Sequence, residues 1–181
     1  MSRTAMMPKI NSGPKSRSRG NFLAHAFVHV LTAAALVHST MTLAQDQDKV
    51  KAGLEVWKSS GCADCHGPFA DGERDDDDYP MGANLRTTRL DAAAIKLTIG
   101  CGRPGTGMPS FDAGAYTVHA CYGRPLGAAP DNLQPTPRVL SLDEIDALVT
   151  YLQARIVGHG KVTREECLFY YDGKADCDDF K

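Results

Sequence analysis

Residues 61–67 read Gly-Cys-Ala-Asp-Cys-His-Gly, so that two cysteines are separated by two residues and a histidine directly follows the second. A Cys-x-x-Cys-His run is typical of a site where haem is attached covalently to protein. Two cysteines on one short turn can each add to a haem vinyl group, and the adjacent histidine is then held under the ring to ligate the iron. We therefore predict one haem c, attached through Cys62 and Cys65, with His66 as its proximal ligand.

Two other kinds of site also use closely spaced cysteines. A thioredoxin-like redox pair belongs in a βαβ setting. A structural zinc site needs a second pair of ligands at close spacing. The sequence contains neither pattern, so both interpretations are weaker than haem attachment.

The first 44 residues have the organisation of a cleaved secretory signal peptide. They contain five basic residues and no acidic residue, an apolar run over residues 22–37, and a small-x-small cleavage site at residues 42–44. A retained membrane anchor is the alternative, but the apolar run is short and contains histidines, which makes it a poor membrane span. We predict cleavage after Ala44, export to the periplasm, and no stable membrane anchor.

The charge of the remaining chain is acidic. The sequence has 20 basic and 22 acidic residues, and removal of the 5 basic residues in 1–44 leaves 137 residues with a net charge of −7. An acidic surface argues against nucleic acid as a partner, because phosphate binding needs clustered Lys and Arg. Complementary charge speeds encounters between soluble proteins. We therefore expect redox partner proteins with a positively charged docking face.

Four cysteines remain once the haem pair is set aside: Cys101, Cys121, Cys167 and Cys177. In an exported chain thiols tend to oxidise, so two disulfides are expected, and four cysteines allow three pairings. We favour Cys101 with Cys121 and Cys167 with Cys177, because each pair brackets a turn-rich segment that otherwise lacks a core. Free buried cysteines are the alternative.

Three segments are predicted to be helical. Residues 48–60 place Val50, Leu54 and Trp57 on one face at helical spacing. Residues 91–99 begin at an aspartate that can cap a helix N-terminus and place Ile95 and Ile99 on one face.

The third segment, residues 141–156, opens with the capping box Ser-Leu-Asp-Glu. Its apolar stripe comprises Leu142, Ile145, Leu148, Val149, Leu152 and Ile156. Gly53 lies on nearly the same side of the first helix as Trp57, where a missing side chain would let another helix cross closely. We expect residues 141–156 to be that helix.

Residues 71–78 are almost entirely charged and cannot be core. We interpret them as a solvated loop extended by charge repulsion. Clustered carboxylates could instead bind calcium, and Asp172, Asp176 and Asp178 are a second, similar candidate.

Residues 101–109 read Cys-Gly-Arg-Pro-Gly-Thr-Gly-Met-Pro, which excludes helix and strand and favours a tight loop that can lie against a flat cofactor. Met108 is the candidate sixth ligand, since methionine paired with histidine raises the haem potential into the range of an electron carrier. Met81, His119 and His159 are the rivals for this position. Ligation by His119 would instead give bis-histidine haem of lower potential.

Taken together, residues 49–157 resemble the single-haem domain of class I c-type cytochromes. The resemblance rests on a helix leading into the Cys-x-x-Cys-His run, a later Gly-Met-Pro loop, and a closing apolar helix with Tyr151. It implies an all-α fold of three to five short helices around one covalent haem. It also implies thioether attachment through both cysteines of the run, with its histidine as proximal ligand and Met108 as distal ligand.

Two segments are longer than a minimal cytochrome requires. These are residues 111–138, which follow the Gly-Met-Pro loop, and a C-terminal extension over residues 158–181. We expect disulfide-pinned loops that cover a haem edge, dock a partner or simply shield the core. Arg86 and Arg103 are candidates to bind the haem propionates.

The function expected from the sequence is periplasmic transfer of one electron between redox partners. Partners such as a periplasmic dehydrogenase and a terminal oxidase fit this role, and the 103–109 loop is similar to that of small cytochromes that serve bacterial dehydrogenases. No catalytic residue is expected. The alternatives are a cytochrome subunit fixed in a dehydrogenase or oxidase complex, and a haem enzyme or gas sensor with an exchangeable sixth ligand.

Overall fold

The structure is a computed structural model that describes residues 45–74, 77–136 and 138–180. The predicted signal peptide over residues 1–44 lies outside the described residues. Within the described ranges the chain is helical and has no β-sheet, with isolated bridges as the only strand-like pairing. The expectation of an all-α fold is therefore confirmed for the described part of the chain. None of the helices in these ranges is long and apolar enough to cross a membrane.

Residues 45–59 form an N-terminal helical segment, and a turn at Gly61 leads into the short helix α2, Cys62–His66. The predicted face of this segment is confirmed, since Val50, Leu54 and Trp57 are all buried. Gly61 has a φ of 72°, a backbone conformation that glycine adopts without steric penalty. The turn therefore separates the two helices and directs α2 away from the first axis.

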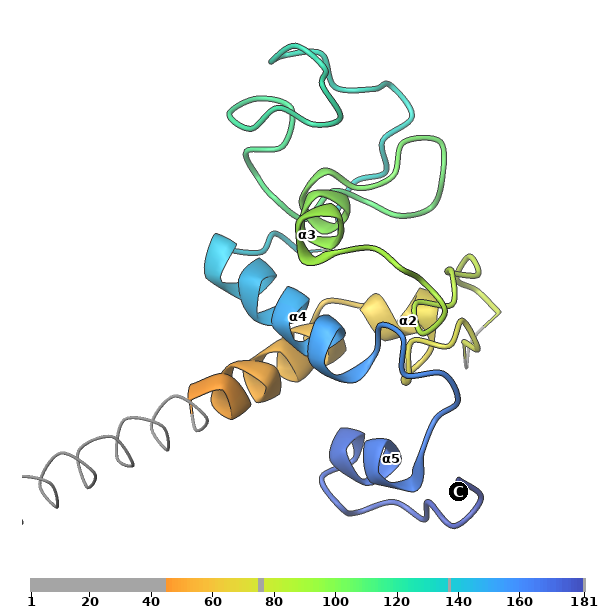
Figure 1. Cartoon of the computed structure of the whole chain (residues 1–181). Coiled ribbons are helices and arrows are strands. Elements are labelled where there is room, and N and C mark those ends of the chain that lie inside the picture. The colour runs from red at the N-terminus through yellow and green to blue at the C-terminus, as the bar shows by residue number, and fades with distance from the viewer. Residues whose placement is uncertain (1–44, 75–76, 137, 181) are drawn as a thin grey trace, which may run out of the picture. The chain divides into compact units, whose positions relative to one another are not determined.

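Helix α3, Ala92–Cys101, begins where the sequence predicted, because the Asp91 carboxylate accepts a hydrogen bond from the Ala94 amide. Its Ile95 and Ile99 are buried, as predicted, and the helix packs against α4. Figure 1 shows α3 lying over α4.

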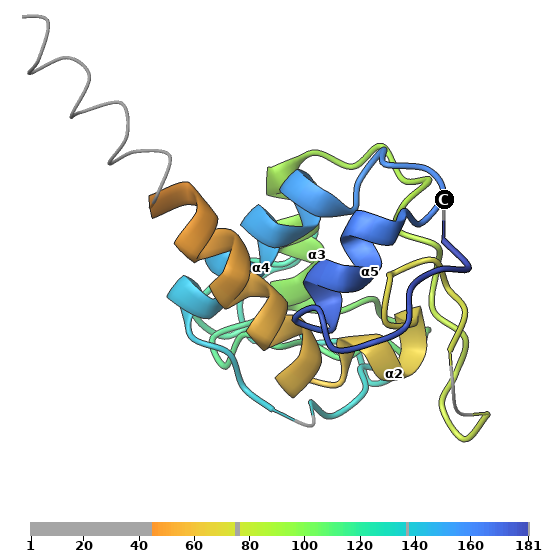
Figure 2. The same ribbon diagram turned by 90° about the horizontal axis from the view of Figure 1, so that it is seen from below.

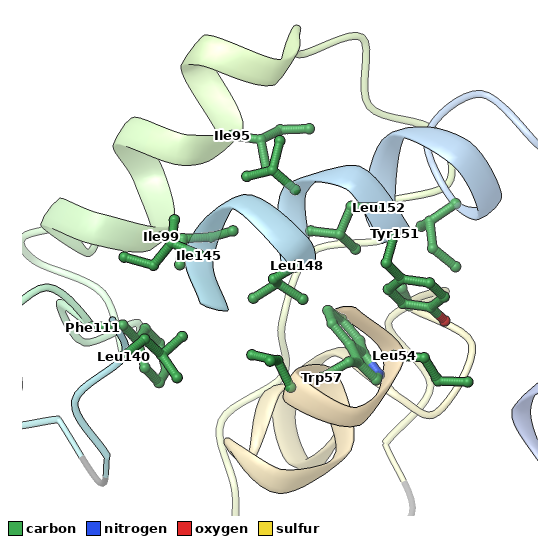
Figure 3. Close-up of a cluster of buried hydrophobic side chains, with 14 of the residues drawn as sticks. Leu54, Trp57, Ile95, Ile99, Phe111, Leu140, Ile145, Leu148, Tyr151 and Leu152 are labelled. Carbon is green, nitrogen blue, oxygen red and sulfur yellow. The ribbon is translucent and has the colours of Figure 1, made fainter. Parts of the chain in front are cut away.

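Helix α4, Leu142–Arg155, begins at the predicted capping box, in which the Ser141 and Glu144 side chains satisfy each other's backbone amides. Ile145, Leu148 and Leu152 face the core (Figure 3). Leu142, however, is 51% exposed, so its prediction as a core residue is wrong. Residues 141–143 are all exposed because the first turn of α4 extends past the elements that cover its later turns.

The N-terminal helical segment crosses α4 at Gly53, as predicted (Figures 1 and 2). A Cβ atom added at Gly53 would lie 2.1 Å from the Ala147 carbonyl oxygen and 2.6 Å from Tyr151 Cβ. No real contact is that short, so this crossing requires glycine. Figure 3 shows Trp57 and Tyr151 side by side at the same crossing, with ring centroids 6.3 Å apart.

We expect Gly53→Ala to destabilise the fold by about 3 kcal/mol, the upper end of the overpacking range, because the nearest obstacle is rigid backbone. Gly100→Ala is the matched control. Gly100 also lies within a helix, α3, but a Cβ added there would meet its nearest neighbour, Asp112 Cβ, at an ordinary contact distance of 3.6 Å. Helix propensity favours alanine over glycine by roughly 1 kcal/mol, so the control is expected to be neutral or stabilising. Urea unfolding followed by circular dichroism measures both changes, and equal stability of the two variants would contradict the close crossing.

Both predicted disulfides are confirmed. Cys101, the last residue of α3, pairs with Cys121, and Cys167 pairs with Cys177. In the chain-entropy model, loops of these lengths each stabilise a fold by about 3 kcal/mol.

The C-terminal extension contains a helix that the sequence did not predict, α5, Arg164–Tyr170. It begins at a second capping box, formed by Thr163 and Glu166. One half-cystine of its disulfide, Cys167, lies within this helix and is buried. Figure 2 shows α5 and the end of the chain beside the loop that follows α2.

The described residues of the connection between α3 and α4 form no helix and are held by local backbone hydrogen bonds. The Phe111 amide donates to the Ile99 carbonyl, and the Leu140 amide donates to the Phe111 carbonyl. These bonds return both ends of the connection to the core, where Phe111 and Leu140 are buried. Its outer part packs a buried tyrosine, Tyr116, against the Cys101–Cys121 disulfide.

Candidate functional site

A cavity of about 1020 Å³ opens between α2, α3, α4 and the loops that follow α2 and α3. It lies at the upper end of the roughly 300–1,000 Å³ typical of small-molecule sites. Its lining includes the buried apolar side chains Trp57, Ile95, Ile99, Phe111, Leu148 and Leu152, several of which Figure 3 labels. Such a lining favours a large apolar ligand over water.

All four residues predicted to hold the cofactor line this one cavity: Cys62, Cys65, His66 and Met108. The first three come from α2, and Met108 comes from the loop after α3, more than 40 positions later in the sequence. The fold thus brings the two separate motifs to the same cavity.

The two α2 cysteines are three positions apart on a helix, and both are free thiols. Burial, reinforced by the nearby Asp64 carboxylate, raises the pKa of the Cys62 thiol to about 12. The same two causes, in the same order, raise the pKa of Cys65. A redox-active dithiol instead depends on a lowered thiol pKa. These surroundings therefore do not favour the thioredoxin-like interpretation.

The His66 imidazole is fixed in one tautomer. Its Nδ1 lies 2.8 Å from the Ala83 carbonyl oxygen, which can only accept, so Nδ1 carries the proton and Nε2 keeps a free lone pair. Burial and the Arg103 guanidinium lower the pKa of His66, and together they outweigh the opposing hydrogen bond to Ala83. At neutral pH His66 is therefore a neutral imidazole with Nε2 available to a metal.

Residues 82–86, which we call the strap, lie directly against α2. The Gly82 amide donates to the Cys65 carbonyl at 2.7 Å. A Cβ added at Gly82 would lie 2.7 Å from His66 Nδ1, so a side chain there would collide with the imidazole. Sequence reasoning named the preceding residue, Met81, as a rival ligand, but it did not identify Gly82 or Ala83 as site residues.

Met108 is half-buried at the cavity and packs against the core cluster. Its loop is closed by its own backbone, since the Arg103 amide donates to the Met108 carbonyl at 3.0 Å. The Thr106 hydroxyl also donates to the Arg103 carbonyl and accepts from the Met108 amide. A Cβ at Gly107 would lie 2.7 Å from Pro80 Cγ, so this loop touches the segment that precedes the strap.

The rivals for the sixth position are placed differently. Met81 lines the cavity, although it is 75% exposed. His119 and His159 are not among the lining residues. His119 Nδ1 lies 2.6 Å from an Asp112 carboxylate oxygen, and His159 Nδ1 lies 3.4 Å from Glu166.

The two arginines considered as propionate ligands lie in different places. Arg103 lines the cavity. Arg86 does not, and its guanidinium is already bonded to Glu166 and to backbone carbonyls of residues 69, 160 and 161. The proposed role of Arg86 at a propionate is therefore wrong, because every side of its guanidinium is directed at protein.

The indole N–H of Trp57, one of the residues lining the cavity, is buried within the protein. The indole is 2% exposed, and Nε1 has no hydrogen-bond partner among the described residues. The ring also lies beside His66, with centroids 6.0 Å apart. A buried indole N–H normally finds a partner, so the unpaired Trp57 donor is unusual.

No group of three or more His, Cys, Asp or Glu side chains within the described ranges is placed to hold a metal ion. The acidic run lies partly outside those ranges, at residues 75–76. In the C-terminal extension, Asp176 instead accepts from the Asp178 amide, and Asp178 pairs with Arg164.

Comparison of the chain with protein-family models, with curated proteins and with solved structures gives no match.

Proposed function

We propose that this chain binds one covalent haem c in the cavity and carries single electrons between redox partner proteins. One observation carries the proposal: two thiols, one neutral imidazole and one thioether line the same apolar cavity from two distant motifs. Haem c supplies a one-electron ferric–ferrous couple when it is bound. We also propose that the fold is a class I cytochrome c domain, because the described chain is helical and has no sheet.

Each chain group has a distinct part in this proposal. Cys62 and Cys65 would hold the cofactor through thioether bonds, and His66 would hold the iron through Nε2, with Nδ1–H bonded to the Ala83 carbonyl. Met108, which lines the same cavity, would provide a thioether ligand to the iron. The apolar lining keeps the site at low dielectric, which disfavours the more highly charged oxidation state.

The partners we propose are soluble or membrane-associated redox proteins of the periplasm, including a dehydrogenase as donor and an oxidase as acceptor. The excess of acidic residues after position 44 favours a positively charged docking face on such partners. Their identity does not follow from the cavity, since the reaction needs no substrate pocket of its own.

The proposal is tested by producing the full-length chain with a c-type maturation system and purifying it from the periplasm. We expect a coloured protein with one haem per chain that remains attached in acidified organic solvent. The double variant Cys62→Ser/Cys65→Ser should lose the covalent pigment, whereas His119→Ala, outside the cavity, should keep it. A colourless or extractable wild type would contradict the proposal. Rapid, complete carbon monoxide binding at neutral pH would favour a haem enzyme or gas sensor instead.

A further inference from the structure

The most deeply buried charged residue of the described chain, Arg86, joins the strap to the C-terminal extension. Arg86 is 2% exposed, and its guanidinium donates to both Glu166 carboxylate oxygens at 2.8 and 2.9 Å. Further bonds run to the carbonyl oxygens of Gly160, Lys161 and Phe69. A guanidinium with its donors occupied on both edges has one orientation, and its planar fork makes this geometry specific to arginine.

The backbone around Arg86 is held equally firmly. Its amide donates to the Asn84 side-chain oxygen at 2.9 Å, and its carbonyl accepts from the Gly158 amide at 3.0 Å. The Leu85 amide donates to the Ala70 carbonyl at 2.8 Å. The end of the strap is therefore attached both to the loop after α2, through Leu85, and to the start of the C-terminal extension, through Arg86.

The same strap contains the acceptor that orients His66. Ala83 lies three positions before Arg86, and its carbonyl accepts from His66 Nδ1–H at 2.8 Å. Gly82, next to it, is bonded to the Cys65 carbonyl. A displacement of the strap would consequently move the Ala83 carbonyl relative to the imidazole.

The extension is a rigid anchor for this chain of contacts. Glu166 completes the capping box of α5, and His159 also faces its carboxylate at 3.4 Å. The next residue, Cys167, is disulfide-bonded to Cys177. The Phe69 ring packs edge-on against the rings of Tyr170, Tyr171 and Phe180.

We propose that residues 158–181 position His66, acting from Glu166 through Arg86 and the strap to the Ala83 carbonyl. The redox consequence of this inference rests on the proposed function. A fixed acceptor for Nδ1–H raises the basicity of a ligating imidazole, and a more basic ligand favours the oxidised iron. Loosening the contact should therefore raise the midpoint potential.

Hydrogen exchange of isotopically labelled full-length protein tests the inference. The substitutions are Arg86→Lys, which cannot reach the same set of acceptors, and Glu166→Gln, which keeps the capping box but removes the charge. Glu165→Gln is the matched control, because Glu165 lies on the same helix, is 81% exposed and pairs with Arg155 instead. Nuclear magnetic resonance follows the His66 Nδ1–H proton and the Gly82 and Leu85 amides.

We expect these three protons to exchange about tenfold faster in both test variants, as for the loss of one hydrogen bond, and unchanged in Glu165→Gln. The holoprotein variants should also show a higher midpoint potential. Faster exchange confined to α5 amides would overturn the inference and leave Arg86 a purely structural residue, as would equal exchange in all variants. If the purified protein has no haem, the proposed function fails, but the exchange of Gly82 and Leu85 still decides the positioning inference.

Discussion

Replacing Arg86 by methionine is expected to destabilise the folded protein by about 3–5 kcal/mol at pH 7, the range for breaking a buried ion pair from one side. The Arg86 side chain is 1% exposed and that of Glu166 is 12% exposed, so methionine would leave a carboxylate buried without its cation. Three backbone carbonyls would lose a donor in the same step. Urea unfolding followed by circular dichroism measures the change.

The same substitution has a pH dependence whose sign is fixed by Glu166. Burial alone would raise the pKa of Glu166, but hydrogen bonds from Arg86 and from the Thr163 backbone, with the attraction of the guanidinium, lower it. A carboxyl with a lowered folded pKa stabilises the fold above its unfolded pKa of about 4.3, and this is lost as pH falls through the folded value. The stability gap between wild type and Arg86→Met should therefore narrow below about pH 4.

Arg164→Met provides the control for Arg86→Met. This substitution also replaces an arginine by methionine, but in the extension. The Arg164 and Asp178 side chains of the affected ion pair are 56% and 78% exposed. Exposed ion pairs contribute about 0–1 kcal/mol. Equal effects of the two substitutions would show that Arg86 is not a structural anchor.

Replacing Met108 by alanine is expected to open the sixth coordination position of the proposed haem. The reduced variant should then bind carbon monoxide rapidly and completely, whereas the wild type should not. Loss of a thioether ligand should lower the midpoint potential by on the order of 0.1 V, within the roughly 0.8 V range that axial ligands span. Optical titration with carbon monoxide and redox potentiometry measure the two effects.

Met81→Ala is the matched control for Met108→Ala, since both methionines line the cavity. Met81 is largely exposed, whereas Met108 is half-buried and packs on the core. Met81→Ala should retain the wild-type response to carbon monoxide. The reverse result would assign the sixth position to Met81.

Features with a local chemical signal were predictable from the sequence. The Asp91 cap, the Ser141 capping box and the Gly53 crossing each follow from residues within one helix or from a missing side chain. The disulfide pairing was also predicted, because each loop is short. The grouping of both ligand motifs at one cavity was expected from their chemistry, and their ligation of haem stays a prediction.

Features that depend on distant contacts were not predictable in this way. The propionate role suggested for Arg86 was wrong. Its actual partner, Glu166, lies 80 positions away in the sequence, so the pairing leaves no local pattern. The Ala83 acceptor is a backbone carbonyl, which leaves no mark on residue type. The Thr163–Glu166 capping box could have predicted the start of helix α5. The helix is short and buries only Cys167, so its sequence has no apolar stripe from which to predict it.

The unequal surroundings of the six cysteines bear on how the protein is assembled. Four are joined in disulfides, while the two on α2 have free thiols. Disulfide exchange proceeds through the thiolate, and the Cys62 thiol, with its pKa near 12, is almost wholly protonated at neutral pH. On the proposal that both thiols attach haem, folding around α2 would slow oxidation of Cys62 before attachment.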